Sequence, residues 1–226
     1  MRRLTYLSGL LLIAAVCGLI DAACFLALGG VFAEIMTGNI LLLAFRIGTG
    51  QQIGDATPLR YLAAISAFVI GALVCGRLMR GNDKKLEREI GFGVEFVLVV
   101  IATVLAFATH AGSEGLGRDV VVSLLACAMG VQNGLMRKHG VADVATNMMT
   151  VTLTGLVSEL KLVGGDNHHW PRRAGSIAIF FLGAILGAFL TRYGAGWPLL
   201  VAAVLLAAAV VILVTRERPI EDAAKA

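Results

Sequence analysis

Long runs of apolar residues, separated by short polar segments, dominate the pattern of this chain. Six of these runs are long enough for a helix to cross roughly 30 Å of hydrocarbon, at about 1.5 Å per residue. They contain few charged residues, as transmembrane helices require. The runs are residues 6–28, 59–80, 91–111, 119–138, 172–193 and 197–215. The pattern therefore predicts an all-α, polytopic membrane helix bundle with six full spans.

Two further apolar segments, residues 31–47 and 141–163, are shorter or interrupted by small polar residues. Small polar side chains can satisfy the backbone groups that a helix break sets free. We therefore expect two short, interrupted or re-entrant segments, with a half-helix over 40–45 in the first. The alternative is a Thr-rich but continuous helix that packs tightly. The interrupting residues are Thr37, Gly38 and Asn39 in the first segment and Asn147, Thr150 and Thr152 in the second.

Residues of the first half recur in the second half at an offset of 112. The matches are Gly18 with Gly130, Asp21 with Asn133, Phe68 with Phe180, Gly71 with Gly183, Ala72 with Ala184, Leu78 with Leu190 and Arg80 with Arg192, while Met36 and Thr37 match Met149 and Thr150 at 113. No polar tract is long enough to hold a separate soluble domain. We interpret residues 1–226 as one membrane domain, with repeat 1 over 1–112 and repeat 2 over 113–226.

Basic residues predict the topology, because Lys and Arg accumulate on the cytoplasmic side of membrane proteins. With six spans, two re-entrant segments and the N-terminus inside, 15 of the 19 Lys and Arg residues lie inside. If both interrupted segments crossed, the count would be 11 inside and 8 outside. The charges thus favour six spans with both termini in the cytoplasm. Each repeat then holds three spans, an odd number, which makes a 3+3 inverted repeat.

The composition narrows the classes of protein and of partner. The chain is 58% apolar and 15% charged, with a mean hydropathy of +0.85, which is outside the range of soluble domains. A net charge of +4 would suggest nucleic acid in a soluble protein, but here the basic residues follow the membrane topology. We therefore expect the lipid bilayer as partner and no nucleic acid.

Motifs for catalysis or metal binding are missing from the sequence. There is no HExxH, GxSxG, P-loop or suitably placed GxGxxG pattern, so we predict no enzyme and no cofactor. All four cysteines fall inside predicted spans and are interpreted as small buried apolar residues. His168 and His169 lack a complete ligand set, and no metal site is expected.

Polar and ionisable residues inside a bilayer are costly and are therefore the first candidates for function. Asp21 lies well inside the first span, and its counterpart Asn133 follows Gln132 in the fourth of the six runs. They can surround a central cavity as contacts for a solute, an ion or a proton, or they can hold helices together through hydrogen bonds. The complete set of candidate solute-binding residues is Asp21, Thr37, Gly38, Asn39, Gln132, Asn133, Asn147, Thr150 and Thr152.

Two further acidic residues in or beside the apolar segments, Glu34 and Glu95, are not part of this candidate set. Glu34 lies at the mouth of the first interrupted segment, where it could act as a gate or be solvated. Glu95 is expected near the inner end of its span, where it could pair with Arg88 or approach the aqueous boundary.

Inverted repeats that meet at the bilayer midplane are the usual architecture of small-solute transporters. The N-termini of half-helices carry partial positive charge and unpaired N–H groups, which favours an anionic or zwitterionic solute. Asp21 argues the other way, since its carboxylate could hold a cation or a proton. We predict a membrane transporter for a small polar solute that exposes the site by alternating access, with proton coupling and a homo-oligomer left open. The alternatives are a non-transporting membrane scaffold or assembly factor, or a channel.

Several motifs together resemble the YoaK-like family of uncharacterised bacterial inner-membrane proteins. The matching pieces are Gly18–Ala22, Phe25–Phe32, Met36–Asn39, Ala128–Asn133 and the two Phe-Gly-Ala helices. The resemblance implies six spans and a bacterial cytoplasmic membrane, and it implies no substrate. The chain departs from the family at Thr150–Val151, where a Thr-Gly pair is common.

Overall fold

The computed structural model describes residues 2–51, 55–81, 83–109, 115–140, 149–161, 164–165 and 169–215, with side chains from Tyr6 onward. Six helices are long and apolar enough to cross a membrane. They are α1 (Arg2–Leu26), α3 (Pro58–Leu78), α4 (Lys84–Ala108), α5 (Leu116–His139), α7 (Trp170–Leu190) and α8 (Gly196–Thr215). The predicted all-α bundle with six spans is confirmed.

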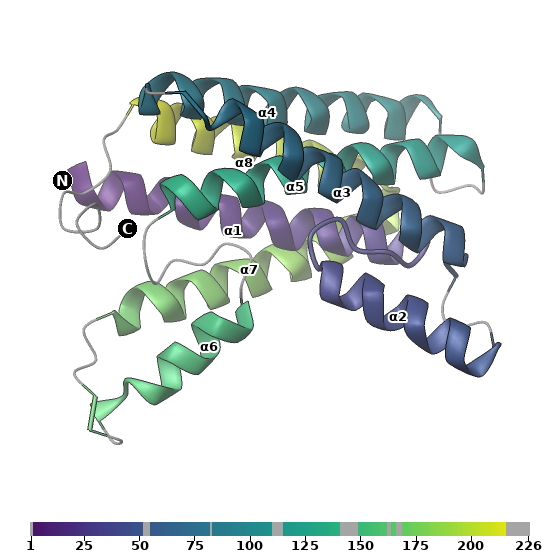
Figure 1. Ribbon diagram of the computed structural model, residues 1–226, viewed down its shortest axis with the longest axis horizontal. Helices are drawn as coiled ribbons and strands as arrows, with labels where there is room; N and C mark the ends of the chain where they lie inside the picture. Colours follow the sequence, from purple (N-terminus) through teal and green to yellow (C-terminus); the bar gives the residue numbers. More distant parts are fainter. Residues whose placement is uncertain are drawn as a thin grey trace.

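Two shorter helices correspond to the interrupted segments. α2 (Met36–Thr49) has 14 residues and α6 (Met149–Ser158) has 10, which gives lengths of about 21 Å and 15 Å. Neither reaches the roughly 30 Å of a hydrocarbon core. Figure 1 shows α2 and α6 on the same face of the bundle, each running from its middle towards an opposite end. A short 3-10 helix, η2 (Thr191–Tyr193), follows α7.

Contacts at one end of the bundle join the helix termini that share a side of the membrane. The Tyr6 hydroxyl at the start of α1 donates to the His139 carbonyl at the end of α5, at 3.0 Å. The Lys138 ammonium donates to the Met79 carbonyl just beyond the end of α3, at 2.6 Å. Lys138 also pairs with Glu87 near the start of α4, at 2.8 Å. The helices α1, α3, α4 and α5 therefore alternate in direction along the chain.

The opposite end of the bundle is joined in the same way. Arg60 near the start of α3 pairs with Asp119 near the start of α5, at 2.6 Å. Phe107 near the end of α4 packs edge-on against Trp197 near the start of α8, with ring centroids 5.7 Å apart. Both ends are thus closed by side chains that tie different spans together.

The packing of the long helices crosses between the two halves of the chain. α1 packs against α7 and α8, α5 packs against α3 and α4, and α4 contacts α8. α2 lies on α3, and α6 lies on α7. The repeat matches α1 with α5, α3 with α7 and α4 with α8. The contact of α1 with α7 then corresponds to that of α5 with α3, and the contact of α1 with α8 corresponds to that of α5 with α4. The contact of α4 with α8 corresponds to itself.

The closest helix contacts are made by glycines whose added Cβ would overlap the backbone of a neighbouring helix. These contacts are Gly18 against Phe180 and Ala184, Gly130 against Phe68 and Ala72, Gly71 against Cys127, and Gly183 against Ala15. The first two are related by an offset of 112, and so are the last two. The residues that repeat along the sequence therefore make equivalent contacts in space.

The break before α2 lies earlier than the sequence predicts. We expected it at residues 37–39, followed by a half-helix over 40–45, but the helix already begins at Met36. Gly29 and Gly30 have φ angles of 96° and 76°, which only glycine adopts at little cost, and they turn the chain back after α1. The non-helical segment is therefore residues 27–35, and we call it the re-entrant loop.

Candidate functional site

A cavity of about 340 Å³ lies between the first turns of α2 and α6, beside α7. It is lined by Glu34, Ile35, Thr37, Met149, Thr150, Val151 and Phe180. The first three residues belong to the first half of the chain and the other four to the second half. Figure 1 shows the two short helices pointing their first turns towards the middle of the bundle. This central cavity is the meeting point of the two interrupted segments.

Asp21 is buried in α1 and fastens the re-entrant loop. Its Oδ1 atom accepts hydrogen bonds from the backbone N–H groups of Ala33 and Glu34, both at 2.9 Å. Its Oδ2 atom is buried and accepts no hydrogen bond within the described residues. The sequence prediction made Asp21 a contact for a solute, ion or proton; in the structure its direct partners are two loop amides.

Asn39 fastens the same loop from the side of α2. Its Oδ1 accepts from the Phe32 N–H at 2.9 Å, and its Nδ2 donates to the Phe32 carbonyl at 2.8 Å. A Cβ on Gly38 would come within 2.9 Å of the Phe32 ring, so the ring packs directly on this glycine. Phe32 also stacks on Phe25 at the end of α1. The Thr-Gly-Asn motif thus serves the loop that precedes it.

Gln132 and Asn133 bring α5 to the same region. The Gln132 amide donates to the Cys17 thiol of α1 at 3.0 Å, and its Oε1 is buried without a hydrogen bond from the described residues. Asn133 donates to the Met129 carbonyl at 2.9 Å, and its side chain also interacts with the Glu34 carboxyl. Asp21 and its repeat counterpart Asn133 therefore both lie close to Glu34.

Three of the candidate threonines lie around the cavities. Thr37 and Thr150 line the central cavity from α2 and α6. Thr152, the buried counterpart of Asn39, lines a second cavity of about 450 Å³ along α6. Both cavities include Thr150 and Val151, so they adjoin along α6. Asn147 lies outside the residues that the structure describes.

The second cavity ends at an ion pair between α6 and α7. Arg173 is 7% exposed and pairs with Glu159 at 2.7 Å, just after the end of α6. Arg173 also donates to the Gly155 carbonyl. Both charged side chains line the cavity. The lining residues of the two cavities thus follow α6 from the charged pair to the central cavity, and we call this line of residues the route along α6.

Two buried carboxyl groups were missed by the sequence reasoning. Glu34 is 6% exposed and lines the central cavity, and Glu95 is 0% exposed in α4. The expectations of a solvated Glu34 and of a Glu95 near the aqueous boundary are wrong. The repeat could have identified Glu34, because at an offset of 113 it falls on Asn147, which belongs to the candidate set. For Glu95 the repeat gives no signal, because Ala207 occupies its counterpart.

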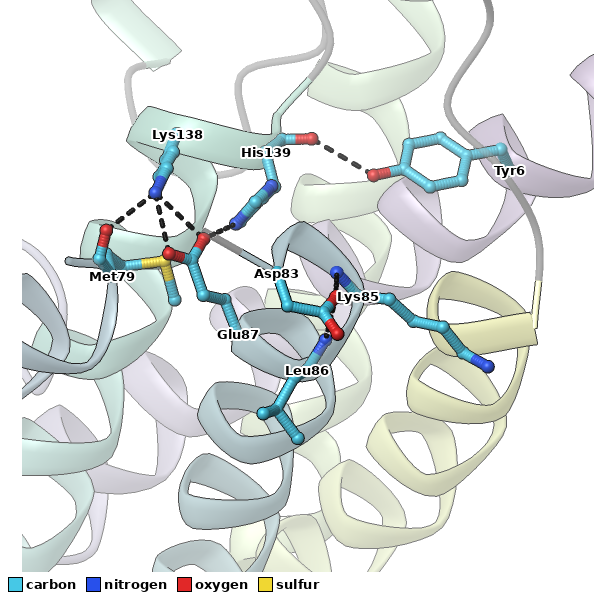
Figure 2. A network of polar contacts seen from close by, with 8 residues as sticks. All are labelled: Tyr6, Met79, Asp83, Lys85, Leu86, Glu87, Lys138 and His139. Atoms are coloured by element: carbon cyan, nitrogen blue, oxygen red, sulfur yellow. Dashed lines mark hydrogen bonds and ion pairs between the residues drawn. The ribbon is translucent and has the colours of Figure 1, made fainter. Parts of the chain in front are cut away.

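A different buried glutamate, Glu87, lies in a charged network at the end of the bundle that holds Tyr6. Figure 2 shows its carboxyl between Lys138 and His139, with Lys138 at 2.8 Å and His139 Nε2 at 3.4 Å. Asp83 caps the start of α4 beside it by accepting from the backbone N–H of Lys85. Glu87 is 3% exposed, but a cation compensates its charge, in contrast to Glu34 and Glu95.

Metal ligation finds no support among the residues that the structure describes. They contain no group of three or more His, Cys, Asp or Glu side chains that could hold a metal ion. The four cysteines are free thiols. The chemistry of the central site therefore rests on carboxyl, amide and hydroxyl groups and on backbone N–H groups.

Comparison with known proteins gives a family without an assigned activity. A family model described as "Protein of unknown function (DUF1275)" matches residues 9–212. The UPF0700 transmembrane protein YoaK of Bacillus subtilis (strain 168) is 27% identical over 153 residues, which are 66% of this chain. The chain spans 64% of the length of that curated relative. No solved structure matches the chain. The predicted resemblance to YoaK-like proteins is confirmed.

Proposed function

We infer the function of this chain, which belongs to the DUF1275 family of membrane proteins, from its central cavity. The proposal is a transporter that carries a small polar solute, anionic or zwitterionic, by exposing this cavity alternately to the two sides of the membrane. It includes no catalytic step. The observation that carries it is a cavity lined by both interrupted segments, one from each half of the chain.

The size and lining of the cavity support a small solute. Its volume of about 340 Å³ lies at the lower end of the roughly 300–1,000 Å³ of small-molecule sites. Thr37 and Thr150 offer hydroxyl groups from opposite walls, and Ile35 and Phe180 supply apolar surface. A few polar groups on a mostly apolar wall orient a ligand without binding it too tightly to be released.

Equivalent packing in the two halves supports an inverted repeat and alternating access. α1 packs against α7 in the same way as α5 packs against α3, and Gly18 and Gly130 make the equivalent close contacts with the backbone of the neighbouring helix. α2 and α6 run towards opposite ends of the bundle (Figure 1). If the two halves of the chain exchanged their conformations, the route along α6 would close and the corresponding route along α2 would open. Such exchange is how repeat transporters move a site between sides.

The polarity of the site supports an anionic or zwitterionic group on the solute. The first turn of α2 lies at the cavity with the positive end of its helix dipole, although the N–H groups of Met36, Gly38 and Asn39 already donate to the carbonyls of Glu34 and Ile35. Arg173 adds a cation to the second cavity, although Glu159 partly compensates it. A positively charged solute would find only Glu34 as a favourable charge among the residues that line the central cavity.

The membrane and its orientation complete the proposal. The end of the bundle that holds Tyr6, Glu87 and Lys138 is the end to which the predicted topology assigns 15 of the 19 basic residues. By the positive-inside rule this end is cytoplasmic, with both chain termini. The YoaK likeness supports a bacterial cytoplasmic membrane. The route along α6 would then open towards the cytoplasm.

A solute screen followed by uptake tests the function directly. Purified protein is screened by thermal shift against small carboxylates, phosphate esters, amino acids and, as a contrasting class, amines; hits are then measured as uptake into proteoliposomes. We expect Thr150→Val to lower uptake roughly two- to tenfold, since one hydrogen bond contributes about 0.5–1.5 kcal/mol. Thr49→Val, at the exposed end of α2, is the matched control with unchanged uptake.

Two outcomes separate the alternatives. Uptake that saturates and is lowered in Thr150→Val supports a carrier. Absence of thermal shift and uptake for every solute class contradicts transport and favours a membrane scaffold. Uptake that stays proportional to solute concentration contradicts alternating access and favours a channel.

A further inference from the structure

We propose that Glu34 and Glu95 form the proton-binding site that couples solute transport to a proton gradient. This inference rests on the proposed transport function and adds its driving ion. It starts from Glu34, which is 6% exposed and lines the central cavity. Neither of its carboxyl oxygens accepts a hydrogen bond of normal distance and angle within the described residues. A buried carboxyl group without a cationic partner at the wall of a membrane cavity is a candidate binding site for a proton or cation.

Glu95 supplies the second carboxyl group from α4. It is 0% exposed, and both of its oxygens lack hydrogen bonds from the described part of the chain. Glu34 is close enough for its charge to act on Glu95. Glu34 at the cavity wall and Glu95 on α4 are thus two buried carboxyl groups from different elements.

The groups that face the pair do not compensate a negative charge. Glu34 meets Asp21 and the Cys17 thiol of α1, and the neutral Asn133 amide of α5. Among the ion pairs of the described residues, none joins a Lys, Arg or His to Asp21, Glu34 or Glu95. The same residues provide no metal site. A proton is the positive charge that needs no further ligands.

Electrostatics then requires a proton on the pair. An ionised carboxylate buried without a partner costs several kcal/mol, and two adjacent carboxylates also repel each other. Of the three carboxyl groups Asp21, Glu34 and Glu95, that of Asp21 is best suited to carry a negative charge, because two backbone N–H groups donate to it. No backbone N–H group within the described residues donates to Glu34 or Glu95. A bound proton removes the negative charge and so lowers the free-energy cost of burying these two carboxyl groups.

The location of Glu34 connects this proton to the solute. An acidic group of a solute that enters the cavity would be repelled by ionised Glu34 and could hydrogen-bond to its protonated form. On one side of the membrane the Glu34 carboxylate takes a proton from water and keeps it while the cavity is closed. On the other side the Glu34 O–H bond breaks and the proton returns to water as the solute leaves.

Labelling with N,N′-dicyclohexylcarbodiimide, an apolar reagent, tests the protonation directly. A protonated carboxyl adds to the carbodiimide: its oxygen bonds to the central carbon, its proton moves to nitrogen, and the acyl group then migrates to give a stable N-acylurea. We expect mass spectrometry of the native protein to find this adduct on Glu34 at neutral pH, decreasing as pH rises. Glu34→Gln should abolish this adduct.

Matched controls come from the same chain. Glu87 is as buried as Glu34 but is paired with Lys138 (Figure 2), so it should stay unlabelled. Exposed Glu89, paired with Lys85, should also stay unlabelled. Folded native protein with no adduct on Glu34 or Glu95 would overturn the proposal. Protection of Glu34 by sodium at constant pH would overturn it in favour of a metal cation.

Coupling is then measured in proteoliposomes with a solute from the screen. An inward proton gradient of about one pH unit should raise solute accumulation about tenfold in the native protein, for one proton per solute. In Glu34→Gln the gradient should have no effect on solute accumulation. Uptake that ignores the gradient in native protein would refute coupling and leave transport standing. Lack of any uptake would refute transport and coupling together, whatever the labelling shows.

Discussion

Replacing Gly130 by alanine is expected to lower the free energy of unfolding by about 1–3 kcal/mol, the usual cost of overpacking. The added Cβ would overlap the backbone of Phe68 and Ala72, which cannot move aside as a flexible side chain does. α3 and α5 would have to separate along their whole contact. Gly130→Leu should prevent folding, and Gly18→Leu should do the same between α1 and α7.

The matched control is Gly76→Ala in α3. A Cβ at Gly76 meets no other atom within 4 Å, so alanine should keep or raise stability, by about 0.5–1 kcal/mol in a helix interior. Thermal unfolding in detergent, followed by tryptophan fluorescence, compares the variants. Equal stability of Gly130→Ala and Gly76→Ala would contradict the close contact between α3 and α5.

Replacing Asp21 by alanine is expected to destabilise the re-entrant loop and abolish solute uptake. The N–H groups of Ala33 and Glu34 would lose their acceptor, at about 1–3 kcal/mol for each buried donor left unsatisfied. Asp21→Asn should preserve most of the stability, because its side-chain oxygen can still accept both hydrogen bonds. Thermal unfolding and proteoliposome uptake of the two variants provide the measurement.

The pair of Asp21 variants also separates two roles of this residue. If it acts as a fastener of the loop, Asp21→Asn resembles the native protein. If instead its charge binds a solute, cation or proton, Asp21→Asn should be as inactive as Asp21→Ala although it remains folded. That second result would contradict the assignment of the proton to Glu34 and Glu95.

The six spans could be predicted because membrane helices depend on local properties of the sequence. A run of about 20 apolar residues is sufficient evidence for a span, and charges outside the runs indicate the topology. The repeat at an offset of 112 has a counterpart in the packing, since the matched residues Gly18 and Gly130 make equivalent contacts. These features need no knowledge of which helices are neighbours.

The interior of the site could not be predicted in the same way, because it depends on contacts between distant residues. Asn39 bonds to the backbone seven residues before it, and Asp21 to loop amides twelve and thirteen residues after it. From the sequence alone, Asp21 and Asn39 could be selected as candidate solute-binding residues, but their bonds to the re-entrant loop could not be foreseen. Glu95 was misplaced because its burial results from packing of α4, whose buried face cannot be known before the bundle is assembled.

The most direct test of the central claim is the accessibility of position 150 from each side of the membrane. Thr150→Cys is made in a background in which Cys17, Cys24, Cys75 and Cys127 are replaced by alanine, and a membrane-impermeant maleimide is applied to either face of sealed vesicles. Val97→Cys is the control, since Val97 is exposed on the outside of α4 and should be shielded by lipid. Alternating exposure of the cavity predicts that the Thr150→Cys variant is labelled from both faces and the Val97→Cys variant from neither. Labelling of position 150 from one face alone, or from neither, would contradict a transporter built around this cavity.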